Sequence, residues 1–215
     1  FLRIIDTDSS QRLLIGSDNN GFYYTDNEGI TLTEANGLGP YSVKRFIMHN
    51  GTNHIYALVN SSPISIYRSI DLGENFEYFI SLDQTQNITS ANISHFDIFT
   101  PRYFDDYIYI IKDMDLYKII NNNLSLVSSL PGNYQDDVLL TGGVGNSGTF
   151  LYAYIDGRIF KSINGGLDWT DKGNSPSSWW WTNGFNTSNL ERDKIFVGGM
   201  ELFKSSTGGN DWNLV

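Results

Sequence analysis

A chain of 215 residues with 40% hydrophobic, 14% aromatic and only 18% charged residues can bury a sizeable core and is too apolar to be disordered. Its formal net charge of −10 opposes binding to nucleic acid or anionic lipid, and no apolar run reaches the length of a membrane-spanning helix. The absence of cysteine excludes disulfides, thiolate metal sites and a cysteine nucleophile.

Short β-rich segments, separated by turns rich in Asn and Gly, follow one another along the chain, and helical periodicity is almost absent. In chain order the clearest segments are 45–49, 54–60, 64–70, 76–82, 93–100, 107–111, 124–130, 137–141, 150–155, 158–162 and 179–185. Segment 107–111 (Tyr-Ile-Tyr-Ile-Ile) does not alternate between apolar and polar residues, so we expect both of its faces to be buried between stacked sheets.

An eight-residue pattern, S-x-D-x-G-x-x-aromatic, recurs between these segments. It is complete in 69–76, has Asn for Asp in 162–169 and has Thr for Asp in 205–212. A degenerate copy at 24–29 carries Asp26 with its glycine displaced by one, and another at 119–123 keeps only the turn residues, with Leu126 in place of the aromatic. The third positions, 26, 71, 121, 164 and 207, are 45, 50, 43 and 43 residues apart, a period typical of four-stranded propeller blades.

We therefore predict an all-β fold, a β-propeller of five four-stranded antiparallel blades. The blades are expected at about 1–39, 40–92, 93–131, 132–173 and 174–215, as a single domain or segment covering 1–215. Because the chain opens with Phe1 and not Met, we expect a processed product or an excised piece of a longer protein, with any export signal and part of a larger ring outside it.

The recurring residues have a structural explanation. Asp or Asn accepts hydrogen bonds from backbone N–H groups in a tight turn, glycine supplies positive φ, and the aromatic side chain packs between blades. The residues assigned to this structural role are Asp26, Ser69, Asp71, Gly73, Phe76, Ser162, Asn164, Gly166, Trp169, Ser205, Thr207, Gly209 and Trp212. The replacement of the acid by Asn164 and Thr207 argues against general acid–base chemistry at these positions.

These octets resemble the Asp-box, or BNR, repeat of sialidases, sortilin-type receptors, photosystem assembly factors and xyloglucanases. Segment 195–212, with Val-Gly-Gly before Lys-Ser-Ser-Thr-Gly-Gly-Asn-Asp-Trp, is similar to propellers of large secreted and surface proteins of Bacteroidota. The resemblance implies a propeller fold and a secreted or cell-surface location. It implies little about activity, because Asp boxes lie at the blade periphery, away from the active sites of the enzymes that carry them.

Candidate catalytic residues are scattered. Sialidase chemistry needs an arginine triad, and only Leu2-Arg3-Ile4-Ile5 resembles its opening motif, without the usual proline. Xyloglucanase-like hydrolysis needs two opposed carboxylates, and no spacing pairs the acids, which alternatively form solvated loops. Acids cluster at Asp105-Asp106, Asp113/Asp115 and Asp136-Asp137.

Metal-site and histidine patterns are equally weak. Asp113-x-Asp115 lacks the glycine-centred loop of a dedicated calcium site, so we predict no metal and no cofactor. His95 and Asp97 share a strand face, where a structural hydrogen bond is expected.

The cluster Trp179-Trp180-Trp181 falls in the opening strand of the last blade. On a strand, Trp179 and Trp181 share one face and Trp180 lies on the other. One interpretation is a ligand-binding surface for a sugar ring or a partner side chain, and the other is packing of all three rings between blades.

The sequence predicts a non-enzymatic recognition or scaffold module of a secreted or cell-surface bacterial protein. It would bind a protein partner or a glycan, without nucleic acid and without membrane insertion, beside other domains of the same chain. The alternative is a fragment of a glycoside hydrolase, xyloglucanase-like or sialidase-like, acting on polysaccharide. A purely structural repeat in a larger surface assembly is a third possibility.

Overall fold

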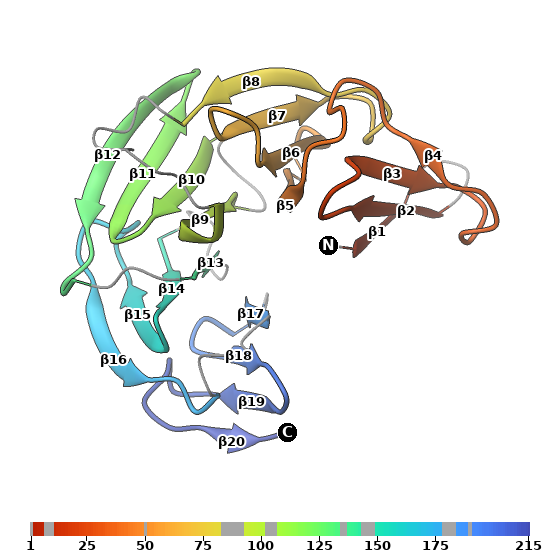
Figure 1. The fold of residues 1–215 in the computed structure, drawn as a ribbon. Helices are drawn as coiled ribbons and strands as arrows, with labels where there is room; N and C mark the ends of the chain where they lie inside the picture. The colour runs from red at the N-terminus through yellow and green to blue at the C-terminus, as the bar shows by residue number, and fades with distance from the viewer. Residues whose placement is uncertain are drawn as a thin grey trace. The chain divides into compact units, whose positions relative to one another are not determined.

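The computed structural model describes residues 2–6, 11–49, 51–82, 93–101, 107–133, 137–142, 149–177, 184–188 and 191–215. These residues form twenty β-strands and one 3-10 turn (η1, Ile93–His95). The strands make five four-stranded antiparallel sheets in which neighbours in sequence are neighbours in space (Figure 1). The fold is therefore all-β, with five blades of the β-propeller type, as predicted. No helix in the described part of the chain is long and apolar enough to cross a membrane.

The chain divides into two compact units, residues 1–93 and 94–215. The first unit holds two blades, and a shared core joins them through side chains such as Leu14, Phe22, Phe46 and Ile55. The strands of its first blade are β1 (Leu2–Asp6), β2 (Gln11–Gly16), β3 (Phe22–Thr25) and β4 (Thr33–Glu34). Those of the second are β5 (Val43–His49), β6 (His54–Val59), β7 (Ser65–Ser69) and β8 (Glu77–Ser81).

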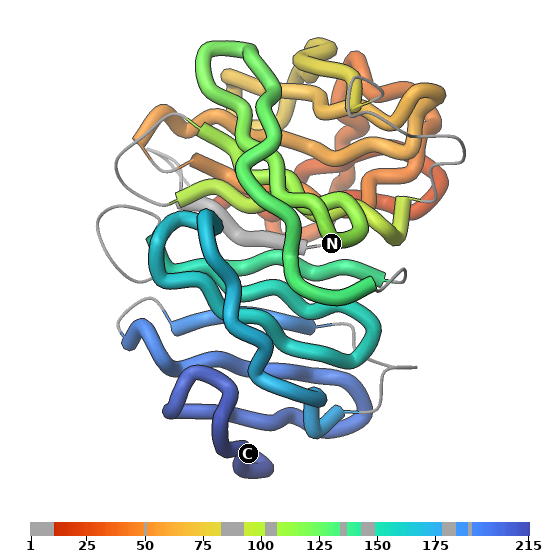
Figure 2. The backbone as a smooth tube through the Cα atoms, turned by 90° about the vertical axis from the view of Figure 1, so that its left-hand side faces the viewer, coloured from red at the N-terminus to blue at the C-terminus, as the bar shows by residue number. Residues whose placement is uncertain are grey.

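The second unit holds three blades. The third blade comprises β9 (Phe96–Phe99), β10 (Tyr107–Lys112), β11 (Asp115–Ile120) and β12 (Asn123–Ser129). The fourth comprises β13 (Val138–Gly142), β14 (Leu151–Ile155), β15 (Arg158–Ser162) and β16 (Thr170–Asn174). The fifth comprises β17 (Gly184–Thr187), β18 (Ile195–Gly198), β19 (Leu202–Ser205) and β20 (Asn213–Leu214). The opening strands β9, β13 and β17 are neighbours, and Figure 2 shows the fourth and fifth blades lying side by side.

In the second, third and fourth blades the second strand is buried on both faces, as the non-alternating sequence of 107–111 predicted for the third. Every residue of β14 and residues 107–111 of β10 are buried, because each sheet packs against a neighbour on either side. The outermost strands β4, β12, β16 and β20 have no fully buried residue. Among the outer strands only β8 has buried residues, Ile80 and Ser81, so burial is lower at the outer edge than in the middle strands.

Candidate functional site

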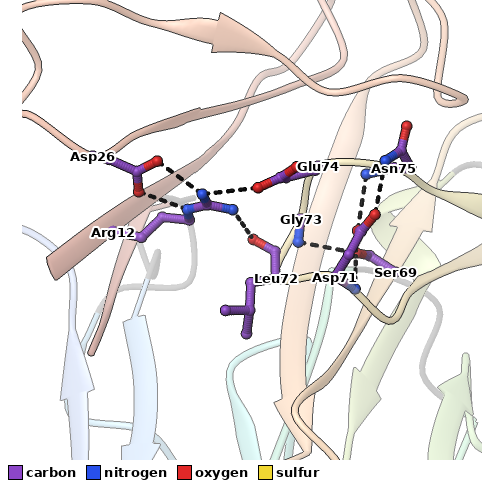
Figure 3. Close-up of polar contacts among 8 residues, drawn as sticks. All are labelled: Arg12, Asp26, Ser69, Asp71, Leu72, Gly73, Glu74 and Asn75. Carbon is purple, nitrogen blue, oxygen red and sulfur yellow. Dashed lines mark hydrogen bonds and ion pairs between the residues drawn. The ribbon is translucent and has the colours of Figure 1, made fainter. Parts of the chain in front are cut away.

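The turn between the third and fourth strands of the second blade is closed by its own side chains (Figure 3). The Ser69 hydroxyl accepts hydrogen bonds from the amides of Asp71 (3.3 Å) and Gly73 (2.9 Å) and donates to Asp71 Oδ1 at 2.7 Å. The Asn75 amide donates to the same Asp71 oxygen at 3.0 Å. Burial raises the pKa of Asp71, but hydrogen bonds from Asn75 and Ser69 outweigh it, so the pKa lies below its ordinary value.

The same network recurs in 162–169 without a carboxylate at the third position. The Ser162 hydroxyl accepts from the Gly166 amide at 2.8 Å, and Asn164 Oδ1 accepts from the Asp168 amide at 3.0 Å. An amide oxygen therefore serves as well as a carboxylate, because the turn needs only an acceptor at this position.

The turn at 205–212 repeats the arrangement with a hydroxyl. Ser205 accepts from the Gly209 amide at 2.9 Å, and Thr207 Oγ1 accepts from the Asp211 amide at 3.0 Å. Trp212 packs against the core that joins the fourth and fifth blades.

The first turn differs from the sequence prediction, because Asn27 and not Asp26 holds the third position. Asn27 Oδ1 accepts from the Thr31 amide at 3.0 Å, and the Thr25 hydroxyl accepts from the Gly29 amide at 3.2 Å. The turn is therefore 25–32, with Thr in place of Ser and its glycine in register. The φ values of 59° at Glu28 and 87° at Gly29 resemble those of Leu72 (58°) and Gly73 (91°), which supports this register.

The third blade has a two-residue hairpin where the other blades have an eight-residue turn. Asn121 and Asn122, with φ of 50° and 62°, connect β11 to β12. Positive φ at both positions is the signature of a type I′ turn, which asparagine tolerates well. Leu126, expected in place of the aromatic, is instead 57% exposed on the outer strand.

Each of two turns also contacts the blade before it. In the first unit, the Phe76 amide donates to Asn36 O at 2.9 Å, and the Phe76 ring lies 4.8 Å from that of Phe22. In the second unit, Ser128 Oγ donates to Gly166 O at 2.5 Å and accepts from Trp169 Nε1 at 3.2 Å. The turns therefore join consecutive blades and do not merely reverse the chain.

Arg12, on β2, extends from the first blade to the second turn (Figure 3). Its guanidinium makes two hydrogen bonds to Asp26 (2.7 and 2.8 Å), one to Glu74 (3.0 Å) and one to Leu72 O (3.3 Å). It also lies over the Tyr24 ring, 4.4 Å from the centroid. The hydrogen bond from Arg12 holds the pKa of Asp26 below its ordinary value, and the one to Asp26 raises the pKa of Arg12.

Two tyrosines on middle strands link the blades of the second unit. The Tyr109 hydroxyl donates to Gly165 O at 3.1 Å, and the Tyr152 hydroxyl donates to Arg192 O at 3.0 Å. Burial raises the pKa of Tyr152, and nearby Asp193 adds to the effect. Asp193 forms an ion pair with Lys161, with 2.5 Å between Oδ1 and Nζ. The hydrogen bond from Lys161 lowers the pKa of Asp193.

The remaining sequence candidates do not converge on one site. Trp179, Trp180 and Trp181, together with Asp105, Asp106 and Asp136, lie outside the described residues. Asp113 pairs with His95 at 2.6 Å, and Asp115 accepts from Ser129 at 2.5 Å. In the described ranges no group of three or more His, Asp or Glu side chains could hold a metal ion.

Asp97 contacts the next blade. It is fully buried, and its carboxylate accepts from the Ile98 amide (2.9 Å) and from the Leu140 amide on β13 (2.6 Å). Asp97 therefore ties the third blade to the fourth near the inner strands.

Sequence reasoning missed Arg12, Asn27, Tyr109 and Tyr152. Tyr109 and Tyr152 are 43 residues apart, which is the repeat interval, so a search for repeated tyrosines would have found them. Arg12 has no such signal, because its partners come from two blades.

No family model matches the sequence, and no curated protein matches it. Solved structures do match its fold. A GH74 enzyme of Niastella koreensis is 18% identical, with a TM-score of 0.65 over 98% of this chain and 37% of its own. YCF48 bound to D1 peptide is 12% identical, with a TM-score of 0.58 over 100% of this chain and 74% of its own. The extracellular domain of BT4673 from B. thetaiotaomicron is 13% identical, with a TM-score of 0.64 over 99% of this chain and 27% of its own. At these identities the likeness supports the β-propeller fold alone.

Proposed function

We propose that this chain is a non-enzymatic recognition or scaffold module of a secreted or cell-surface bacterial protein, built from Asp-box repeats. The proposal rests on what the recurring polar residues bond to. In the turns at 25–32, 69–76, 162–169 and 205–212 they bond to the backbone of their own turn. The repeated chemistry builds a rigid frame, and specificity then belongs to loops and edges that differ between blades.

The binding partner in this proposal is a protein or a glycan. A protein partner is in keeping with the similar fold of YCF48, whose structure holds a D1 peptide, and export is in keeping with the extracellular domain of BT4673. A glycan would stack on the indoles of Trp179, Trp180 or Trp181. Further domains of the same protein remain part of the proposal, since the chain spans only 37% of the GH74 chain.

The alternative function is a glycoside hydrolase fragment, which the fold shared with the GH74 enzyme favours. Such an enzyme needs two carboxylates flanking a glycosidic bond. Asp113 and Asp115 both have partners of their own in the structure, so a hydrolase would draw on Asp105, Asp106, Asp136 or Asp137.

Release of reducing ends from a panel of plant and bacterial polysaccharides separates the two functions. We expect no release above that of a heat-denatured sample. Hydrolysis that disappears in Asp105→Asn, Asp106→Asn, Asp136→Asn or Asp137→Asn would establish the hydrolase and refute the non-enzymatic module. A glycan array then tests the ligand: binding lost in Trp180→Ala or Trp181→Ala identifies a glycan, and no binding leaves a protein as the partner.

A further inference from the structure

The outer strand of the third blade differs from the other four outer strands. β12 has seven residues, Asn-Leu-Ser-Leu-Val-Ser-Ser, and none of them is charged. β4 and β20 have two residues each, β8 carries Glu77, and β16 carries Asp171 and Lys172. Short length, charge and β-bulges are among the means by which edge strands avoid pairing with another chain. β12 is neither short nor charged, and its one register shift, at Val127, lies beyond residues 123–126.

Among the residues that the structure describes, none pairs with the outward-facing backbone groups of β12. β12 is the last strand of its sheet and pairs with β11 alone among the described strands. Residues flanking a two-residue hairpin turn form a hydrogen-bonded pair, here Ile120 with Asn123, and such pairs alternate along the ladder. The N–H and C=O groups of Leu124 and Leu126 are therefore directed away from β11.

The side chains confine the open part of this edge to residues 123–126. Ser128, nearer the end of the strand, contacts the 162–169 turn through Gly166 O and Trp169. Leu124 and Leu126 are two residues apart and share one face of the sheet, and Leu126 is 57% exposed. The missing eight-residue turn and the open edge thus occur in the same blade.

We propose that β12 binds an extended segment of a partner protein, which adds to the third blade as a fifth strand. Another extended backbone presents donors and acceptors at the same spacing as the alternating N–H and C=O groups of this edge, and can replace the water that otherwise bonds to them. The face shared by Leu124 and Leu126 selects a segment with apolar side chains at alternate positions, and the absence of charge on β12 selects an uncharged one. This inference rests on the proposed recognition function and assigns it one surface and one class of partner.

Amide hydrogen exchange on the whole chain tests the proposal, with the capped heptapeptide Thr-Val-Thr-Val-Thr-Val-Thr as the probe. At saturation we expect exchange at the Leu124 and Leu126 amides to slow by about tenfold or more, because a hydrogen-bonded amide must open before it exchanges. The same peptide N-methylated at every interior residue, which lacks donors on both edges, should give no slowing.

Two variants locate the binding surface. Leu126→Lys places a charge on the open edge and should weaken peptide binding by about tenfold. Tyr78→Lys is the matched control, since Tyr78 on outer strand β8 is 58% exposed, and it should bind as the unaltered chain does. Equal thermal midpoints of the two variants show that both are folded.

Three results would overturn the proposal. The first is unchanged exchange at Leu124 and Leu126, and the second is equal binding by the Leu126→Lys variant. The third is a dimer, detected by sedimentation without peptide and lost in Leu126→Lys, which would make a second copy the occupant of the edge. If β12 does not bind the peptide, the proposed recognition function still stands and is tested by the glycan array. Hydrolysis of a polysaccharide would instead refute the recognition function, and the exchange result at β12 would be unchanged.

Discussion

At the junction of the first two blades a guanidinium holds the incoming turn, whereas at the junction of the third and fourth blades two hydroxyls do. Arg12 bonds to Leu72 O and Glu74 in the second turn and to Asp26 in its own blade. Ser128 and Tyr109 donate instead to Gly166 O and Gly165 O. Both arrangements satisfy backbone carbonyls of a turn that docks on the preceding blade, but only the first uses charge.

This difference shows which parts of the repeat are interchangeable. The turn's own hydrogen bonds are the same in both blades, with Ser69 and Ser162 each accepting from the glycine amide four residues on. Apart from Tyr109, whose counterpart Tyr152 lies one repeat interval later, the side chains that meet the turn from the neighbouring blade are not repeated. The repeat therefore fixes the position of each turn, and the contact that receives it varies from blade to blade.

The largest expected loss of stability comes from filling the space where the 69–76 turn meets the first blade. A Cβ on Gly37 would lie 1.9 Å from Phe76 O, a backbone atom that cannot move without shifting the turn, and φ is +89°. We expect Gly37→Ala to lower the free energy of unfolding by about 3–5 kcal/mol, from overpacking and backbone strain together. Chemical denaturation measures it.

Gly29 provides the matched control for Gly37. Its φ of +87° is nearly the same, and a Cβ there would meet nothing within 4 Å. Gly29→Ala should therefore show the backbone strain alone, about 1–2 kcal/mol. Equal losses of unfolding free energy in the two variants would mean that a Cβ at Gly37 does not clash with Phe76 O. Close packing of the turn on the first blade would then contribute nothing to the difference.

The sequence was sufficient for the elements that repeat. Period, turn residues and non-alternating strands predicted five four-stranded blades, because each blade repeats the same local chemistry. The same reasoning failed at Asp26, where the pattern sought an acid. The turn needs only an acceptor, which Asn27 provides one residue later, with Thr25 in place of serine.

Contacts between blades were harder to predict from the sequence. Arg12 and Glu74 are 62 residues apart, and neither belongs to the repeated pattern. Structural hydrogen bonds were expected for His95 and Asp97, and both residues make them. Their partners, the Leu140 amide for Asp97 and Asp113 for His95, could not be named from the sequence. Such contacts depend on how sheets stack, which no local pattern encodes.

Removal of the guanidinium should have the next largest effect. Arg12→Ala leaves Asp26, Glu74 and Leu72 O without their shared donor at a contact where Arg12 itself is buried. Breaking a buried pair is strongly destabilising, but both carboxylates are partly exposed, so we expect a loss of about 2 kcal/mol.

Arg158→Ala is the control for Arg12→Ala. Arg158 pairs with Asp171 inside one blade and is more exposed than Arg12, so its loss should cost less than about 1 kcal/mol. Equal losses in denaturant would show that the Arg12 contact is only an ordinary surface pair and that charge plays no special part at the first junction.

Acid should weaken the junction of the first two blades and leave the hydroxyl contacts between the third and fourth blades unchanged. The pKa of Asp26 is lowered in the folded chain by Arg12, so its stabilising contribution is complete above the ordinary pKa of about 4 and is lost as pH falls through the lower folded value. Neither Ser128 nor Tyr109 depends on a carboxylate for its bond to the turn. The Phe76 amide, bonded to Asn36 O, reports on the first junction.

Protection factors at pH 7 and pH 3 measure this difference. Protection of the Phe76 amide should fall with acid in the unaltered chain and fall less in Arg12→Ala, where Asp26 has lost its partner. The fall in protection that remains in Arg12→Ala reports the protonation of Asp71, whose pKa is also lowered in the folded chain. An identical acid response in the two proteins would exclude the Arg12–Asp26 pair as its source.

The smallest expected effect concerns the hydroxyl junction itself. Ser128→Ala removes the donor to Gly166 O and the acceptor for Trp169 Nε1, both partly buried, so we expect a loss of about 1 kcal/mol. Ser125→Ala, on the same strand, loses only an exposed bond to Lys118 O at 3.4 Å and should change little. Because no charge is involved, the Ser128→Ala loss should be the same at pH 7 and pH 4.5 in denaturant. A pH-dependent loss would contradict the division into a charged junction and a neutral one.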